Sequence, residues 1–104
     1  MIGQMVRRMG YLSVACNKPL DALTLFSRAS GRFDAVIVDE MMPDLRGIQL
    51  ATRLLRIKAD IPIILMTGHG DMISLEQVRE SGARATLIKP VLKERLQVVL
   101  DGLL

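Results

Sequence analysis

Three polar side chains suited to phosphoryl chemistry follow three separate apolar segments of the chain. Asp39 ends "AVIVD", Thr67 ends "IPIILMT" and Lys89 follows "ATLI". A carboxylate oxygen can attack a phosphoryl group and form an acyl phosphate. A hydroxyl can donate to the new oxygens, and a lysine can balance the added negative charge. The three residue types together therefore indicate a phosphoryl-accepting site if the fold brings them to one place.

Each of the three residues also has a simpler interpretation as an independent polar strand end. An Asp can cap a turn, and a Lys can form a surface ion pair. For any one residue that interpretation is favoured, but three such residues at the ends of neighbouring strands favour a shared site. Other chemistries are weaker: "GHGD" at 68–71 lacks the Gly-Lys-Ser/Thr of a phosphate-binding loop, and His69 has no partner at zinc-ligand spacing.

The elements that must position these residues follow from two alternating hydrophobic periods. Apolar runs predict strands, and apolar positions at helical spacing predict helices. The expected strands cover 11–15, 35–39, 61–67 and 85–88; the expected helices cover 2–9, a segment from Pro19 to Gly31, 47–57, a segment from Ser74 to Gly82, and a segment that opens at Pro90.

Local signals mark the ends of these helices. Asn17 followed by Pro19 is typical of a helix start, with the Asn oxygen as the cap. Leu20, Leu23 and Phe26 would form the apolar stripe of that helix. Ser74 with Gln77 fits a capping box, and the predicted stops are Gly10, Gly31 and Gly82.

Strands that alternate with amphipathic helices predict an α/β fold with a doubly wound parallel sheet. The 104 residues suit one domain, 1–104. In an open parallel sheet, ligands bind at the carboxyl ends of the strands. Asp39, Thr67 and Lys89 all stand at such ends, so we expect them to converge on one rim.

Composition excludes several other functions. Fourteen Lys and Arg against eleven Asp and Glu give a net charge of +3, and the basic residues are scattered. This pattern favours a solvated surface over direct nucleic-acid binding. The chain has no apolar run long enough for a membrane span and no signal peptide. Cys16 is the single cysteine, which we interpret as a small buried hydrophobe in a cytoplasmic protein.

The chain resembles bacterial response-regulator receiver domains of the CheY-like superfamily. The segments that carry the resemblance are "VDEMMPDLRG", "ILMTGHG" and "ATLIKP". It implies a flavodoxin-like sheet of strand order 2-1-3-4-5 and a cis peptide before Pro90. By the same resemblance Asp39 would be the phosphoacceptor, Thr67 the switch hydroxyl and Lys89 the phosphate-pairing lysine, while Asp39 and the backbone carbonyl of Met41 would bind Mg²⁺.

The resemblance also implies a role in a two-component phosphorelay. A histidine kinase or a phosphotransfer domain would give its phosphoryl group to Asp39. The chain would not be an enzyme beyond self-catalysed phosphotransfer and dephosphorylation.

The N-terminal part departs from the family. Receivers begin with a buried strand that ends in an acidic pair, whereas this chain begins with a predicted helix and has no acid before Asp21. We therefore expect an N-terminally truncated receiver with weak Mg²⁺ binding, since Glu40 and Asp44 are interpreted as solvated loop charges. Thr86 stands where the family has an aromatic switch residue, so the usual hydroxyl–aromatic switch is not expected.

The gap left by the first strand could be filled by residues 11–15 closing against 35–39, by a second chain, or by upstream residues. The alternative function is thus a pseudo-receiver that is not phosphorylated and acts as an interaction or dimerisation module, through an exposed sheet edge or strand exchange. A flavodoxin-like enzyme is disfavoured, because no cofactor loop or second base is visible.

Overall fold

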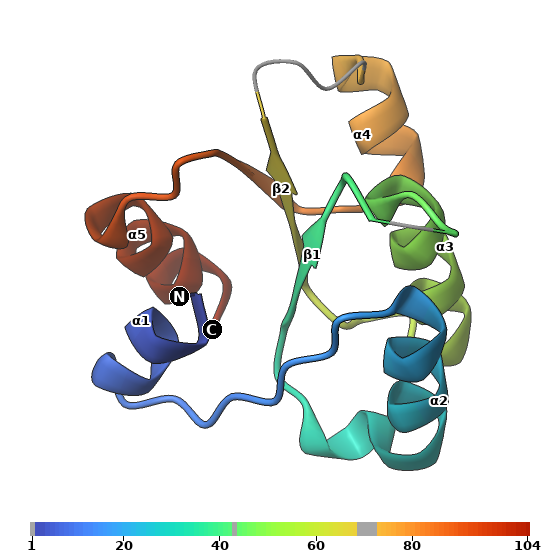
Figure 1. The fold of residues 1–104 in the computed structure, drawn as a ribbon, viewed down its shortest axis with the longest axis horizontal. Helices are drawn as coiled ribbons and strands as arrows, with labels where there is room; N and C mark the ends of the chain where they lie inside the picture. Colours follow the sequence, from blue (N-terminus) through green and yellow to red (C-terminus); the bar gives the residue numbers. More distant parts are fainter. Residues whose placement is uncertain (1, 43, 69–72) are drawn as a thin grey trace.

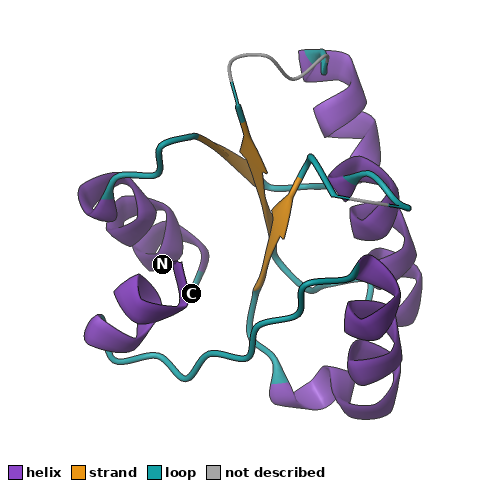
Figure 2. Cartoon of the chain, in the orientation of Figure 1, coloured by secondary structure: helices purple, strands orange, loops and turns teal. Residues whose placement is uncertain are grey.

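The computed structural model describes residues 2–42, 44–68 and 73–104, and its helices and strands alternate along the chain (Figures 1 and 2). The elements are α1 (Ile2–Arg8), α2 (Pro19–Ala29), a 3-10 helix η1 (Ser30–Arg32), β1 (Val36–Asp39), α3 (Gly47–Ile57), β2 (Ile63–Thr67), α4 (Leu75–Ser81), β3 (Ala85–Ile88) and α5 (Lys93–Leu103).

The described strands form one parallel sheet in the order β1-β2-β3. Val38 pairs with Leu65, and Leu65 pairs with Thr86. The parallel direction sends the carboxyl ends of all three strands to the same rim. The predicted α/β class with a parallel sheet is therefore confirmed, and the strand order is that of the last three strands in the order 2-1-3-4-5.

Helices cover both faces of this sheet. In Figure 1, α1 and α5 lie on one side, while α2, α3 and α4 lie on the other. Ile64 on the central strand packs in a cluster with Val6 and Leu96, whereas Ile63 and Leu65 pack in a cluster with Leu54. The side chains of Ile63, Ile64 and Leu65 are all fully buried. Burial on both faces explains why the β2 segment is a continuous apolar run without alternation.

The prediction of a strand at 11–15 is wrong. Residues 11–16 form an irregular connection between α1 and α2, in which Leu12 and Val14 are exposed. A strand needs a neighbour for its backbone hydrogen bonds, and the segment does not close against β1. Cys16 lies in the same connection and is exposed, so its interpretation as a buried residue is also wrong.

Two predicted helix starts are displaced. The N-cap of α2 is Lys18, without a side-chain cap, because a proline forces the residue before it into an extended conformation. Asn17 is therefore one position too early, and Leu20 is exposed. Pro90 does not open α5, since the four residues 89–92 connect the end of β3 at Ile88 to the start of the helix at Lys93.

Other local signals are confirmed. Ser74 and Gln77 form the predicted capping box of α4, and Gly82 ends that helix with a φ of 85°. Gly10 has a φ of 99° after α1, and the Lys89–Pro90 peptide is cis as expected. None of the helices formed by the described residues has both the length and the hydrophobicity of a membrane-spanning segment.

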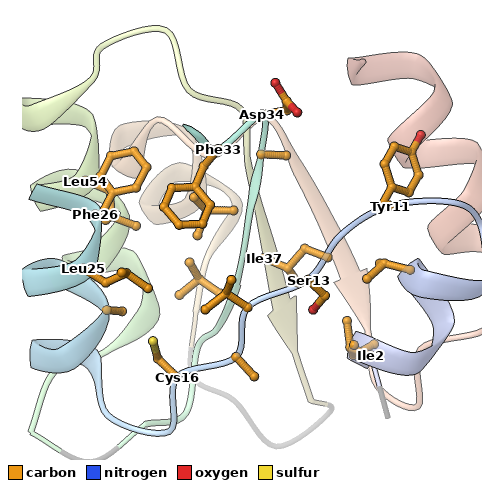
Figure 3. A pocket seen from close by; sticks show the side chains of 18 of the residues that line it. Ile2, Tyr11, Ser13, Cys16, Leu25, Phe26, Phe33, Asp34, Ile37 and Leu54 are labelled. Atoms are coloured by element: carbon orange, nitrogen blue, oxygen red, sulfur yellow. The ribbon is translucent and has the colours of Figure 1, made fainter. Parts of the chain in front are cut away.

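An open cavity of about 780 Å³ lies beside β1, between the strand and the 11–16 connection. Ile37 and Ser13 are among its lining residues, and Figure 3 shows Phe26 and Phe33 toward α2 and Tyr11 toward α1. The cavity lies where a further strand could pair with β1. The closure of residues 11–15 against 35–39, one of the three ways of filling the gap, is thus excluded for this structure.

Candidate functional site

Asp39 and Lys89 form the centre of the rim at the carboxyl ends of the strands. Asp39 ends β1, and Lys89 directly follows β3. The Lys89 Nζ donates to both Asp39 carboxylate oxygens at 2.7 Å. Both side chains are about one third exposed. The structure therefore brings together the predicted carboxylate and ammonium at a position that solvent can reach.

Thr67 lies between them at the end of the central strand. Its backbone oxygen accepts a hydrogen bond from the Lys89 N–H at 2.8 Å. The described residues show no hydrogen bond between the Thr67 hydroxyl and Asp39 or Lys89. Thr67 is thus a neighbour of the ion pair by sheet topology, at the distance of one strand, and its side chain is not part of the pair.

The turn after β1 holds the Asp39 carboxylate from its other side. The Met41 backbone N–H donates to Asp39 Oδ1 at 3.0 Å. Asp39 Oδ1 therefore accepts hydrogen bonds from both Lys89 Nζ and the Met41 N–H, so the carboxylate is fixed from two sides.

Glu40 is the residue that sequence reasoning missed. It was expected to be a solvated loop charge, but it is fully buried. Its carboxylate accepts hydrogen bonds from Arg46 Nε at 2.6 Å and from the Ile48 N–H at 3.0 Å. Alternation along a strand sends residue 40 to the face opposite residue 39. An acid placed just after a buried strand, with a basic residue at the start of the next helix, was the signal available in the sequence.

The donor set does not fit a tightly held Mg²⁺. Magnesium prefers one or two carboxylates with water and phosphate oxygens. Among the residues that the structure describes, no cluster of three potential metal ligands is present. Asp39 is paired with Lys89, Glu40 is bound by Arg46, and Asp44 is exposed. The assignment of Asp39 and the Met41 carbonyl as metal ligands remains a prediction from the family resemblance.

Two further residues of the sequence analysis have different outcomes. Thr86 lies in β3 and is exposed, and its place in a switch remains a prediction. His69 lies outside the described residues, as does most of "GHGD".

A model of the response regulator receiver domain matches residues 1–101. The chain belongs to this family. The receiver core therefore accounts for the sheet and for the residues at its rim.

Curated relatives come from bacteria and from plants. The chain is 38% identical over 88 residues to a cyclic di-GMP phosphodiesterase response regulator of Xanthomonas campestris, which covers 83% of this chain and 23% of that protein. It is 32% identical over 93 residues to a two-component response regulator of Arabidopsis thaliana, which covers 89% of this chain and 17% of that protein. The chain thus spans about a fifth of these relatives, and the family is not restricted to bacteria.

Solved receiver structures share the fold closely. One from Clostridium thermocellum is 26% identical with a TM-score of 0.90, covering 97% of this chain and 80% of that chain. The receiver domain of a Pseudomonas aeruginosa sensor histidine kinase is 25% identical with a TM-score of 0.85, covering 98% of this chain and 84% of that chain. That neighbour has a magnesium ion coordinated in its active-site cleft.

Proposed function

We propose that the chain is a phosphoacceptor that receives a phosphoryl group on Asp39 from a phosphohistidine of a histidine kinase or phosphotransfer domain. The observation that carries the proposal is the contact of Lys89 Nζ with both oxygens of a partly exposed Asp39 at the sheet rim. In the reaction an Asp39 oxygen attacks phosphorus, the P–N bond breaks, and the imidazole nitrogen takes the electron pair and a proton. The product is an acyl phosphate.

Lys89 would contribute by balancing charge during this transfer. The phosphoryl group adds about −1.5 to −2 charge at neutral pH. An ammonium group already in contact with Asp39 needs little movement to reach the new oxygens. Thr67, one strand away, would donate from its hydroxyl. The chain would otherwise have no catalytic activity, and it would act in the cytoplasm, where histidine kinases have their phosphorylated domains.

The test is incubation of the chain with acetyl phosphate, followed by intact-mass measurement. Here the P–O bond of acetyl phosphate breaks and acetate leaves. We expect the mass of one phosphoryl group to be gained by the wild type and not by Asp39→Asn, because the amide cannot form the acyl phosphate. Modification that persists in Asp39→Asn, or a wild type that gains no mass, would contradict the proposal.

A second candidate function is an interaction module that pairs with another copy of the chain. It is favoured by the cavity beside β1 and by the backbone of that strand. The Val36 N–H donates to the oxygen of Pro62, just before β2, and the Glu40 N–H donates to the oxygen of Met66 in β2. Since successive N–H groups of a strand point to opposite edges, those of Ile37 and Asp39 point toward the open side. A strand edge with free donors is a template for pairing with another chain.

A further inference from the structure

Every polar group of Glu40 has a partner in the described structure. Its N–H donates to the Met66 oxygen at 2.9 Å, and its oxygen accepts from the Gly47 N–H at 3.0 Å. Its carboxylate binds Arg46 and the Ile48 N–H. A fully buried carboxylate is unfavourable unless it is both paired and hydrogen-bonded. Glu40 therefore links the end of β1 to β2 and to the start of α3.

The side chain of Glu40 supplies an acceptor at the start of α3, in addition to the Gln49 side chain, whose oxygen accepts from the Arg46 N–H at 2.9 Å. The residue at the N-cap of α3 is Arg46, whose guanidinium has five donors and no acceptor. The first N–H groups of a helix need acceptors, and a negative charge is favourable there. Glu40 Oε1 accepts from Ile48, the second residue of the helix. Arg46 then neutralises the same carboxylate, so the two residues act as one unit.

This unit is directly connected to the turn that follows Asp39. Glu40 lies between Asp39 and Met41 in the sequence. The Met41 N–H donates a hydrogen bond to the Asp39 carboxylate. The start of α3 also packs directly against the same backbone. A Cβ added to Gly47 would lie 2.6 Å from the backbone oxygen of Asp39 and 2.7 Å from the Glu40 Cα. A shift of Glu40 would consequently move the Met41 N–H and release one side of the Asp39 carboxylate.

We propose that Glu40, held by Arg46, is a positioning residue for the phosphorylation of Asp39. It does not touch the phosphoryl group, and it acts by fixing the Met41 N–H against Asp39 Oδ1 while Lys89 holds the carboxylate from the other side. The proposal rests on the proposed phosphoacceptor function. Because the buried Glu40 carboxylate is bound by Arg46 and the Ile48 N–H, it is not available at the rim as a metal ligand beside Asp39.

The first experiment measures the rate of phosphorylation by acetyl phosphate in the wild type, Glu40→Gln, Arg46→Gln and the double variant. Glu40→Gln keeps the size of the side chain and one acceptor oxygen but loses the charge. We expect the maximal rate to fall roughly tenfold in each single variant, with half-saturation by acetyl phosphate unchanged, since small misplacements slow a positioned reaction. The double variant should be no slower than either single variant, because the pair acts as one unit.

The matched control is Ser74→Ala, which removes the cap of α4, whose Ser74 hydroxyl accepts from the Gln77 N–H. It weakens a helix start that is not connected to Asp39, so its phosphorylation rate should equal that of the wild type at a temperature where all variants are folded. A Glu40→Gln rate that also equals the wild-type rate would overturn the positioning role.

A second readout separates this proposal from the proposed function. Hydrogen exchange of the Met41 amide, followed by NMR, reports its bond to Asp39 without any phosphorylation. We expect faster exchange in Glu40→Gln and unchanged exchange in Ser74→Ala. Unchanged Met41 exchange in Glu40→Gln would overturn the positioning role, whereas a wild type that gains no phosphoryl group would overturn the phosphoacceptor function instead.

Discussion

At the scale of single residues, the partly exposed Asp39–Lys89 contact should contribute little to stability. Their side chains are 32% and 37% exposed, respectively. Ion pairs exposed to this extent contribute only about 0–1 kcal/mol, because water and salt screen them. The contact therefore adds little to folding, and its geometry matters chiefly for the chemistry of the carboxylate.

Lys89→Met should separate these two contributions. We expect the free energy of unfolding to change by less than about 1 kcal/mol. The rate of Asp39 phosphorylation should fall by about 10²-fold, the effect of removing one charged donor from a developing anion. Urea unfolding and intact-mass kinetics measure the two quantities. Lys93→Met, at an exposed position at the start of α5, is the control and should leave both unchanged; equal phosphorylation in the two variants would refute the role of Lys89.

At the scale of elements, the sequence predicted those features that depend on local chemistry. The capping box of α4 and the positive φ at Gly82 follow from residues within a few positions of each other. The apolar run of β2 was recognised because both of its faces are buried. The ends of the strands could therefore be predicted, and with them the positions of Asp39 and Lys89 at the sheet rim.

Features that depend on a distant partner were not predicted correctly. Residues 11–15 have strand composition, but composition does not supply a neighbouring strand. Glu40 was expected to be a solvated loop charge, because it follows a predicted strand. Its actual environment depends on α3 packing back onto β1. The acceptor for the Ile48 N–H at the start of α3 is Glu40, six residues before the N-cap Arg46, outside the window in which capping signals are read.

The close approach of α3 to β1 gives a prediction with opposite signs at two glycines. At Gly47 an added Cβ would meet the backbone of Asp39 and Glu40, and Gly47→Ala should lower the free energy of unfolding by about 1–3 kcal/mol. At Gly102 in α5 an added Cβ would meet no atom within 4 Å beyond the backbone of its own helix. Gly102→Ala should therefore raise the free energy of unfolding by up to about 1 kcal/mol through helix propensity. Urea unfolding of both variants measures the difference, and a stabilising Gly47→Ala would contradict the tight contact.

At the scale of the whole molecule, the cavity beside β1 leaves apolar side chains of that strand incompletely covered. Val36 and Ile37 are only half-buried, although their partners on β2, Ile63 and Ile64, are fully buried. The apolar walls of this cavity contribute less to folding than a closed core would, because apolar burial stabilises by about 25 cal/mol per Å². Covering them would stabilise the chain, and the proposed pairing with a second copy through the edge of β1 would do so.

Pairing through this edge predicts dimers that depend on the Ile37 N–H. We expect the wild type to show a mass that rises toward that of a dimer with concentration in light scattering. Ile37→Pro removes a donor that points to the open side and leaves the bonds of Val36 to Pro62 and of Glu40 to Met66 in place. Proline is tolerated at such edges, so the variant should stay folded by circular dichroism and remain monomeric. A monomeric wild type, or a dimer that persists in Ile37→Pro, would exclude pairing through β1.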